Sequence, residues 1–540
     1  MKKIFLVSFI LLSQITFCQI GDWIWMNGSN TPNQTGVYGT QGVSSPSISP
    51  PGIYEPVEWT DKQGNFWIMG GQNFASLNND LWKYDKTSGQ WTWMRGSAIS
   101  CPVGNYGTQG VSSSSNLPGG RGICATSWTD SIGNLWLFGG WACLDGLGTG
   151  NSIINDLWKY NIASNEWTWM KGSNIISQQG VYGTFGVPNI SNTPGCRYET
   201  AVSWTDNNGN LWFFGGWGKD ASNTQGYMND IWKYNIASNI WTWMGGSNLA
   251  NQLPVYGTKG VPSPSNTPGG RWIYSKWIDA TGNLWIFGGE RGSNLFYNDV
   301  WKYDVTTNMW AWINGPNVTN DPGNYGIKCV PSLNNIPPAR SENRACWKDN
   351  CGRFWMLGGT TLNWAANVNN DLWCYDPTND LWTWVNGDII PNQPGSYGTQ
   401  GIASPSNLPP ARLGAVAWKN GVDLWLFGGR YNNVFLNDLW KYVIDPTCPA
   451  CNMSGVNENH LTLSYLYPNP TSGVFNITTT KQINQIEIFN FQGKMILNQN
   501  INNKHARIDL AFFPSGIYHI RLIYDDKTIS TNRLIIKDND

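Results

Sequence analysis

Hydrophobic positions in this chain occur in short runs that are bounded by Gly, Asn, Asp and Pro. Runs such as Leu135-Trp-Leu-Phe138 and Trp167-Thr-Trp-Met170 mix aromatic and aliphatic residues, which predicts β-strands joined by tight turns. Between these runs nothing shows the 3.6-residue period of an amphipathic helix. The 34 Trp and 61 Gly residues agree with this, because Trp fills the space between sheets and Gly permits tight corners. We therefore expect an all-β protein.

One hexapeptide pattern recurs six times along the chain. It reads Asn-Asp, then Leu, Ile or Val, then Trp, then Lys or Cys, then Tyr, and it occupies residues 79–84, 155–160, 229–234, 298–303, 370–375 and 437–442. Gly-Gly doublets recur with it at intervals of about 70 residues. Self-similarity of this kind is typical of solenoids, propellers and other repeat arrays.

A Trp-x-Trp pair follows the first five hexapeptides but not the sixth. The missing pair stands at the other end of the chain, as Trp23 and Trp25. A linear stack of repeats gives no reason for this offset. A closed ring does, because an N-terminal strand can complete the last unit and join the two ends.

Each repeat contains four predicted strands, which in one unit cover residues 121–128, 134–140, 155–160 and 167–170. The turn between the first two strands holds Asp and Gly, as at Asp130 and Gly133. Asp can bond its own backbone there and Gly can adopt positive φ. Four-stranded antiparallel units repeated around an axis form a β-propeller.

The repeat resembles that of the kelch family. The resemblance rests on Pro-x-x-Arg opening the first strand, Gly-Gly closing the second, and a Trp-Lys-Tyr strand followed by a Trp-containing strand. It implies a six-bladed kelch-like β-propeller closed by the N-terminal strand. The repeat exceeds the usual kelch length through an insertion, Val37–Val43 in the first unit, that recurs in all six. Because it recurs, we expect it to be a structural part of each blade.

The C-terminal segment has a different character. It contains Tyr467-Pro-Asn-Pro470 and Ser515-Gly-Ile-Tyr518 within a strand-rich stretch. These motifs resemble the type A C-terminal sorting domain of the Bacteroidetes type IX secretion system. The resemblance implies a small β-sandwich that the type IX secretion machinery recognises; an accessory binding domain is the alternative.

The N-terminus has the pattern of a secretory signal peptide. Lys2 and Lys3 precede the apolar run Ile4–Leu12, which is too short to span a bilayer, and we expect cleavage before Gln19. The predicted organisation is a signal peptide at 1–18, the propeller at 19–446, a linker at 447–463 and the sorting domain at 464–540. We expect a secreted or outer-surface protein, exported via the periplasm, with no transmembrane segment.

Charge and histidine content exclude several functions. The net charge is −1 and only 13% of residues are charged, so the basic field that nucleic-acid binding needs is absent. All three histidines, His460, His505 and His519, lie outside the propeller. A Ser-His-Asp triad or a His-ligated metal therefore cannot form there, and the resemblance to galactose oxidase is confined to the blades without the copper site. We predict no cofactor and no metal, and we expect the linker thiols Cys448 and Cys451 to form a local disulfide.

Arginines at one repeated position are candidate ligand-binding residues. They open the first strand in five of the six repeats, at Arg121, Arg197, Arg271, Arg340 and Arg412. If that strand is innermost, they form an incomplete ring suited to carboxylate or sulfate groups. The alternative is that each arginine bonds loop carbonyls or the third-strand Asp of a neighbouring blade.

Aromatic residues that do not recur in every repeat are candidates for stacking on sugar rings. They lie in loops on the face with the long insertions, at Trp141, Trp217, Trp272, Phe296 and Trp364. Acidic residues on the first strand, at Glu55, Glu58, Glu199 and Glu342, are candidates for acid–base work in the channel.

The sequence favours a binding or adhesion protein that recognises a polysaccharide or glycoprotein through these loops. The alternative is a carbohydrate-active enzyme of lyase or mutarotase type that uses Arg, Glu and Tyr on the same face. A purely structural surface component is a third possibility.

Overall fold

The computed structural model is built from β-strands and turns, and none of the residues it describes is helical. The structure describes residues 21–73, 77–143, 152–200, 202–272, 275–292, 294–361, 366–444, 464–469, 471–490, 494–525 and 529–537. The predicted signal peptide and linker lie outside these residues. The chain divides into two compact units, Met1–Ser454 and Gly455–Asp540. Within the described residues, no helix is long and apolar enough to cross a membrane.

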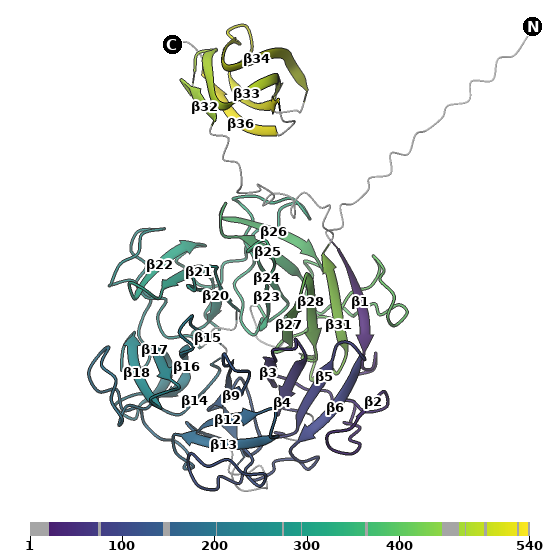
Figure 1. Cartoon of the computed structure of the whole chain (residues 1–540), viewed down its shortest axis with the longest axis vertical. Coiled ribbons are helices and arrows are strands. Elements are labelled where there is room, and N and C mark those ends of the chain that lie inside the picture. The colour runs from purple at the N-terminus through teal and green to yellow at the C-terminus, as the bar shows by residue number, and fades with distance from the viewer. Residues whose placement is uncertain are drawn as a thin grey trace, which may run out of the picture. The chain divides into compact units, whose positions relative to one another are not determined.

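The first unit contains six sheets with four-stranded antiparallel cores, one per repeat, arranged in a ring (Figure 1). The strands of each core are given from the first strand of the repeat outward. The first repeat has β3 (Val57–Thr60), β4 (Phe66–Met69), β5 (Leu81–Asp85) and β6 (Gln90–Arg95), and the second has β8 (Thr126–Thr129), β9 (Leu135–Phe138), β12 (Leu157–Asn161) and β13 (Glu166–Lys171). The third has β15 (Ser203–Thr205), β16 (Leu211–Lys219), β17 (Gln225–Asn235) and β18 (Ile240–Gly245), and the fourth has β19 (Ser275–Ile278), β20 (Leu284–Glu290), β21 (Phe296–Asp304) and β22 (Met309–Asn314). The fifth has β23 (Ala345–Lys348), β24 (Phe354–Leu357), β25 (Leu372–Asp376) and β26 (Leu381–Asn386), and the sixth has β27 (Val416–Asn420), β28 (Asp423–Phe427), β31 (Leu439–Ile444) and β1 (Gly21–Asn27). A short strand, β2 (Ser44–Ser45), is added outside β6.

Strand β1 completes the last sheet. It pairs antiparallel with β31, with Gly21 opposite Ile444 and Trp23 opposite Tyr442. Trp23 is fully buried and its ring lies 5.0 Å from that of Tyr442. The prediction of an all-β propeller closed by the N-terminal strand is therefore confirmed.

Neighbouring sheets are joined through tryptophans near the axis. The indole N–H of Trp59 donates to the carbonyl of Trp136 in the next repeat at 2.9 Å, and Trp128 donates to Trp212 at 2.7 Å in the same way. The first strands also contact one another, and β27 contacts β3 across the junction of the last and first repeats. The recurring tryptophans thus form the core between blades, as the repeat pattern predicts.

A buried aspartate organises every repeat. Asp156, directly before β12, accepts the indole N–H of Trp158 at 2.6 Å and the hydroxyl of Tyr106 at 2.7 Å. Tyr106 comes from the inserted segment, and the equivalent Tyr–Asp bond is present in all six repeats. The insertion is therefore tied into each blade, which confirms that it is a structural part of the repeat.

The first repeat lacks the arginine that accompanies this aspartate in the others. Asp80 is fully buried; Tyr38 and Trp82 both donate to its Oδ2 atom at 2.7 Å, while Oδ1 has no partner. Burial raises the pKa of Asp80 to about 6, from an ordinary value of 3.8. The folded protein therefore retains this proton at a pH where the unfolded chain has lost it.

We expect Asp80→Asn to stabilise the protein at pH 7 by about 1–3 kcal/mol, because it removes the cost of ionising a buried carboxyl. Since the folded-state pKa is raised, wild type loses stability relative to the variant as pH rises from about 4 to 6. The advantage of the variant should vanish below about pH 4. Urea unfolding of both proteins between pH 4 and 7.5 measures this. Asp438→Asn is the matched control. Arg412 pairs with Asp438, so loss of this carboxylate should destabilise the protein at pH 7.

Short elements beyond the Gly-Gly doublets build one face of the ring. In the second repeat β7 (Arg121–Gly122), β10 (Trp141–Ala142) and β11 (Ser152–Ile153) form a small sheet, and a disulfide joins Cys101 to Cys143. In the third repeat β14 (Arg197–Tyr198) pairs with the extended end of β16. In the sixth repeat β29 (Arg430–Tyr431) pairs with β30 (Val434–Phe435). These elements hold the loop residues described below.

The second unit is a five-stranded antiparallel sheet around its own apolar core, which includes Phe475, Ile488 and Leu522. Its strands are β32 (Ser464–Tyr467), β33 (Val474–Asn490), β34 (Met495–Asp509), β35 (Gly516–Tyr524) and β36 (Ile529–Ile536).

Candidate functional site

The five repeated arginines are enclosed in the blades and do not line an open ring. The Arg197 guanidinium makes two bonds to Asp230, at 2.7 and 2.9 Å, and one to the carbonyl of Gly215 at 3.1 Å. The five side chains are 0–1% exposed, and their ion pairs are Arg121–Asp156, Arg197–Asp230, Arg271–Asp299, Arg340–Asp371 and Arg412–Asp438. This geometry contradicts the prediction that they are available to an anionic ligand. The partner is the third-strand Asp of the same repeat, not of a neighbouring blade.

Three predicted tryptophans lie on the face built by the short elements, where two tyrosines connect them. Trp141 contacts Tyr198 of the next repeat with ring centroids 5.3 Å apart, and Tyr198 contacts Trp217 at 5.3 Å. Trp217 pairs with Tyr227 in the β16–β17 register, and Tyr227 contacts Trp272 at 5.4 Å. All five side chains are half-buried. We call this row of residues from three repeats the aromatic line.

The other two aromatic candidates do not join it. Phe296 is fully buried, so the prediction that it offers an exposed ring is wrong. Trp364 lies outside the described residues. Sequence reasoning missed Tyr198 and Tyr227. A signal for Tyr198 was present, because it occupies the position after the repeated arginine that Trp272 fills one repeat later.

The aromatic line ends at the propeller axis, beside a group of buried acids. Trp272 packs against the buried Cys124. The donor atoms of Cys124, Glu55 and Glu199 lie within 4.8 Å of one another, although the residues come from three repeats. We call these three residues the axial cluster. It contains two of the acids predicted on the first strand, Glu55 and Glu199.

Backbone hydrogen bonds between repeats fix the axial cluster in place. The amide of Glu55 donates to the carbonyl of Gly414 at 3.0 Å, and that of Glu199 to Ile123 at 3.3 Å. Glu55, Cys124 and Glu199 adopt positive φ, from 50° to 58°, which is uncommon for non-glycine residues. The side chains are thus held by contacts across blade boundaries and not by their own strands.

Burial dominates the electrostatics around the axis. It raises the pKa of Glu55 to about 7, against the opposing effect of the nearby Arg344 guanidinium, and it also raises the pKa of the Cys124 thiol. The Tyr54 hydroxyl donates to Glu342 at 2.5 Å, and burial raises its pKa as well. Two groups of the axial cluster, the Glu55 carboxyl and the Cys124 thiol, therefore favour the protonated form at the axis.

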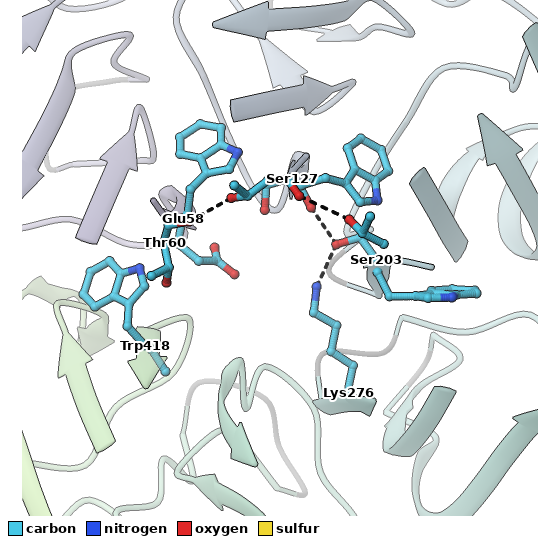
Figure 2. A pocket seen from close by; sticks show the side chains of 12 residues that line it. Glu58, Thr60, Ser127, Ser203, Lys276 and Trp418 are labelled. Carbon is cyan, nitrogen blue, oxygen red and sulfur yellow. Dashed lines mark hydrogen bonds between the residues drawn. The ribbon is translucent and has the colours of Figure 1, made fainter. Parts of the chain in front are cut away.

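Further along the axis, the channel opens into a pocket of about 250 Å³ lined by the first strands (Figure 2). Lys276 and Glu58 point into it, and the Lys276 ammonium donates to the Ser203 hydroxyl at 2.7 Å. Burial lowers the pKa of Lys276 to about 8. Arg344 pairs with Glu58. Sequence reasoning placed Glu58 in the channel but missed Lys276, which no motif distinguishes from other strand lysines.

Comparisons with known proteins identify both parts of the chain. Residues 465–537 match the family described as the secretion system C-terminal sorting domain. Kelch domain-containing protein 10 from Rattus norvegicus, Mus musculus and Homo sapiens is 24% identical over 278 residues, or 43% of this chain. The alignments span 60%, 56% and 55% of the length of these relatives. The solved "Structure of YjhT" aligns with 72% of this chain and 95% of that chain, at 15% identity and a TM-score of 0.45.

The first unit is therefore a kelch-type β-propeller. The second is a C-terminal sorting domain, which marks the protein for export by the type IX secretion system to the cell surface or beyond it.

Proposed function

We propose that the exported propeller is a binding protein that recognises a carbohydrate chain along the aromatic line. The observation that supports this proposal most directly is the row of ring contacts Trp141–Tyr198–Trp217 and Tyr227–Trp272, which the strand pairing of Trp217 with Tyr227 joins across three repeats. Partly exposed aromatic faces stack on the apolar faces of sugar rings while their polar edges stay hydrated. A line of such faces suits an extended glycan better than a single small molecule.

The fold does not itself require these aromatic residues. The position of Trp141 and Trp217, directly after the Gly-Gly doublet, is filled by Gln72, Glu290 and Thr360 in other repeats. Residues needed for blade packing recur in nearly every repeat, as Trp-x-Trp does. The non-recurring line is therefore free to serve recognition.

The ligand we favour is a neutral polysaccharide or the glycan of a surface glycoprotein. The five repeated arginines, which an anionic glycan would need, are enclosed in ion pairs. Arg197 and Arg271 precede Tyr198 and Trp272 but are enclosed in ion pairs, whereas Glu199 follows Tyr198 and Glu290 pairs with Trp272. These two acids favour neutral over acidic chains.

We expect Trp217→Ala to weaken glycan binding at least tenfold, or by about 1.4 kcal/mol, because one stacking face is lost from the middle of the line. Glycan-array screening followed by calorimetry with the best neutral polysaccharide measures this. Phe185→Ala is the control, because Phe185 is an aromatic residue 54% exposed in the third-repeat insertion, outside the line. Equal affinity of wild type and Trp217→Ala for every bound glycan would refute the proposal.

A carbohydrate-active enzyme of lyase or mutarotase type is the second candidate, and Glu290 is the observation in its favour. Glu290 is 5% exposed, its Oε2 atom has no partner, and burial raises its pKa to about 7. A carboxyl that keeps its proton near neutral pH suits a general acid. Turnover of a bound glycan that disappears in Glu290→Gln would establish this candidate. Glycan binding without turnover would support the binding protein and not the enzyme.

A further inference from the structure

The axial cluster of Glu55, Cys124 and Glu199 combines three metal-donor groups in a buried place. Their donor atoms lie within 4.8 Å of one another, and no side chain in the group is more than 6% exposed. The residues come from the first, second and third repeats, so the axis itself brings them together. Histidine has no part in it.

Glu55 supplies a second observation that points to a ligand. Its side chain is fully buried, and neither carboxylate oxygen has a partner at ordinary hydrogen-bond distance, although the Cys124 thiol and the Tyr54 hydroxyl lie near it. A buried charge without a partner is costly, so such a group either keeps a proton or holds a cation. The neighbouring Cys124 and Glu199 supply the further donors that a cation needs.

The donor set selects the kind of cation. A thiolate with two carboxylates suits Zn²⁺, whereas Ca²⁺ and Mg²⁺ take oxygen ligands. Three ionised donors carry three negative charges; one divalent ion balances two of them, and Arg344, which also pairs with Glu58, lies near Glu55 and Cys124. We propose that Glu55, Cys124 and Glu199 bind one zinc ion at the propeller axis.

Zinc in this position cross-links three repeats at the centre of the ring. Because Trp272 packs on Cys124, the metal also supports the inner end of the aromatic line. The proposal does not depend on glycan binding, since metal content is measured without a glycan.

The test measures metal content of the protein purified without chelator or affinity tag from zinc-containing medium. Cys448 and Cys451 are first replaced by serine, so that the linker thiols bind no metal. Elemental analysis should then give one zinc per chain. Cys124→Ser in this background should lower the content at least tenfold, and Cys196→Ser, which removes another buried thiol, should leave it unchanged. Refolding with Co²⁺ should give a thiolate-to-cobalt absorption band that Cys124→Ser abolishes.

If the protein with Cys448 and Cys451 replaced by serine contains no zinc, the proposal is overturned, whether or not the further variants fold. Glu55→Gln tests the remaining alternative, in which Glu55 keeps a proton and binds no metal. If Glu55 only holds a proton, this variant should match or exceed the melting temperature of wild type with or without chelator during refolding. If it binds zinc, the variant should melt below wild type refolded with zinc, and the chelator should remove that difference.

Discussion

Deletion of residues Gly21–Asn27 should abolish cooperative folding of the propeller or cause it to aggregate. The deletion removes β1, exposes the edge of β31 and leaves an unpaired strand that can join other chains. It also removes the fully buried Trp23, a loss that alone costs about 3–5 kcal/mol. Because domains are stable by only about 5–15 kcal/mol, little or no stability should remain. Size-exclusion chromatography and thermal unfolding measure the outcome.

The control is the double replacement of Ser44 and Ser45 by glycine. These residues form β2, a short strand outside the four-stranded core of the first sheet, so their loss should change the melting temperature little. A chain lacking Gly21–Asn27 that remains monomeric and melts like the intact protein would disprove closure by β1.

Replacement of Arg412 by Ala should destabilise the propeller by about 3–5 kcal/mol, because it leaves Asp438 buried and unpaired. Glycan affinity, measured on the folded fraction, should be unchanged, because Arg412 is only 1% exposed and does not reach a ligand. Arg271→Ala should behave in the same way. Chemical denaturation and binding measured on the same samples separate stability from recognition.

Replacing both partners provides the matched control. Arg412→Met with Asp438→Asn removes the two charges together, while the amide oxygen still accepts from Tyr397 and Trp440. Much of the lost stability should return. An Arg412→Ala protein with unaltered stability and weakened anion binding would restore the arginine-ring hypothesis.

The architecture was predictable because every repeat poses the same packing problem. The displaced pair Trp23 and Trp25 indicated both the ring and its closing strand. The sequence also held a signal for the role of the arginines, since Arg and the third-strand Asp recur together in five repeats. In the first repeat, where this Arg is absent, one carboxylate oxygen of Asp80 has no hydrogen-bond partner. Recurrence at that frequency is typical of a residue that serves the fold.

The axial cluster could not be predicted in the same way. Glu55 and Glu199 occupy the same position of the repeat, but Cys124 lies one position further along its own. Each of the three lies before its first strand in a backbone conformation that the strand pattern does not encode. Which side chains meet at an axis depends on the blade geometry. The aromatic line was foreseen in part, through Trp141, Trp217 and Trp272, because these residues break the repeat pattern.

Closure by β1 also leads us to expect a particular order in which the propeller assembles. Ser29 and Asn437, which bond across the closing sheet, are 408 residues apart in sequence. Contacts between such distant residues close a large loop, which slows folding and places them late in the pathway. We therefore expect β1 to pair only after the last repeat has formed, with two strand edges of the open ring exposed until then. Refolding rates of the propeller should be limited by this final pairing, and chaperones that mask sheet edges should act on the chain before it.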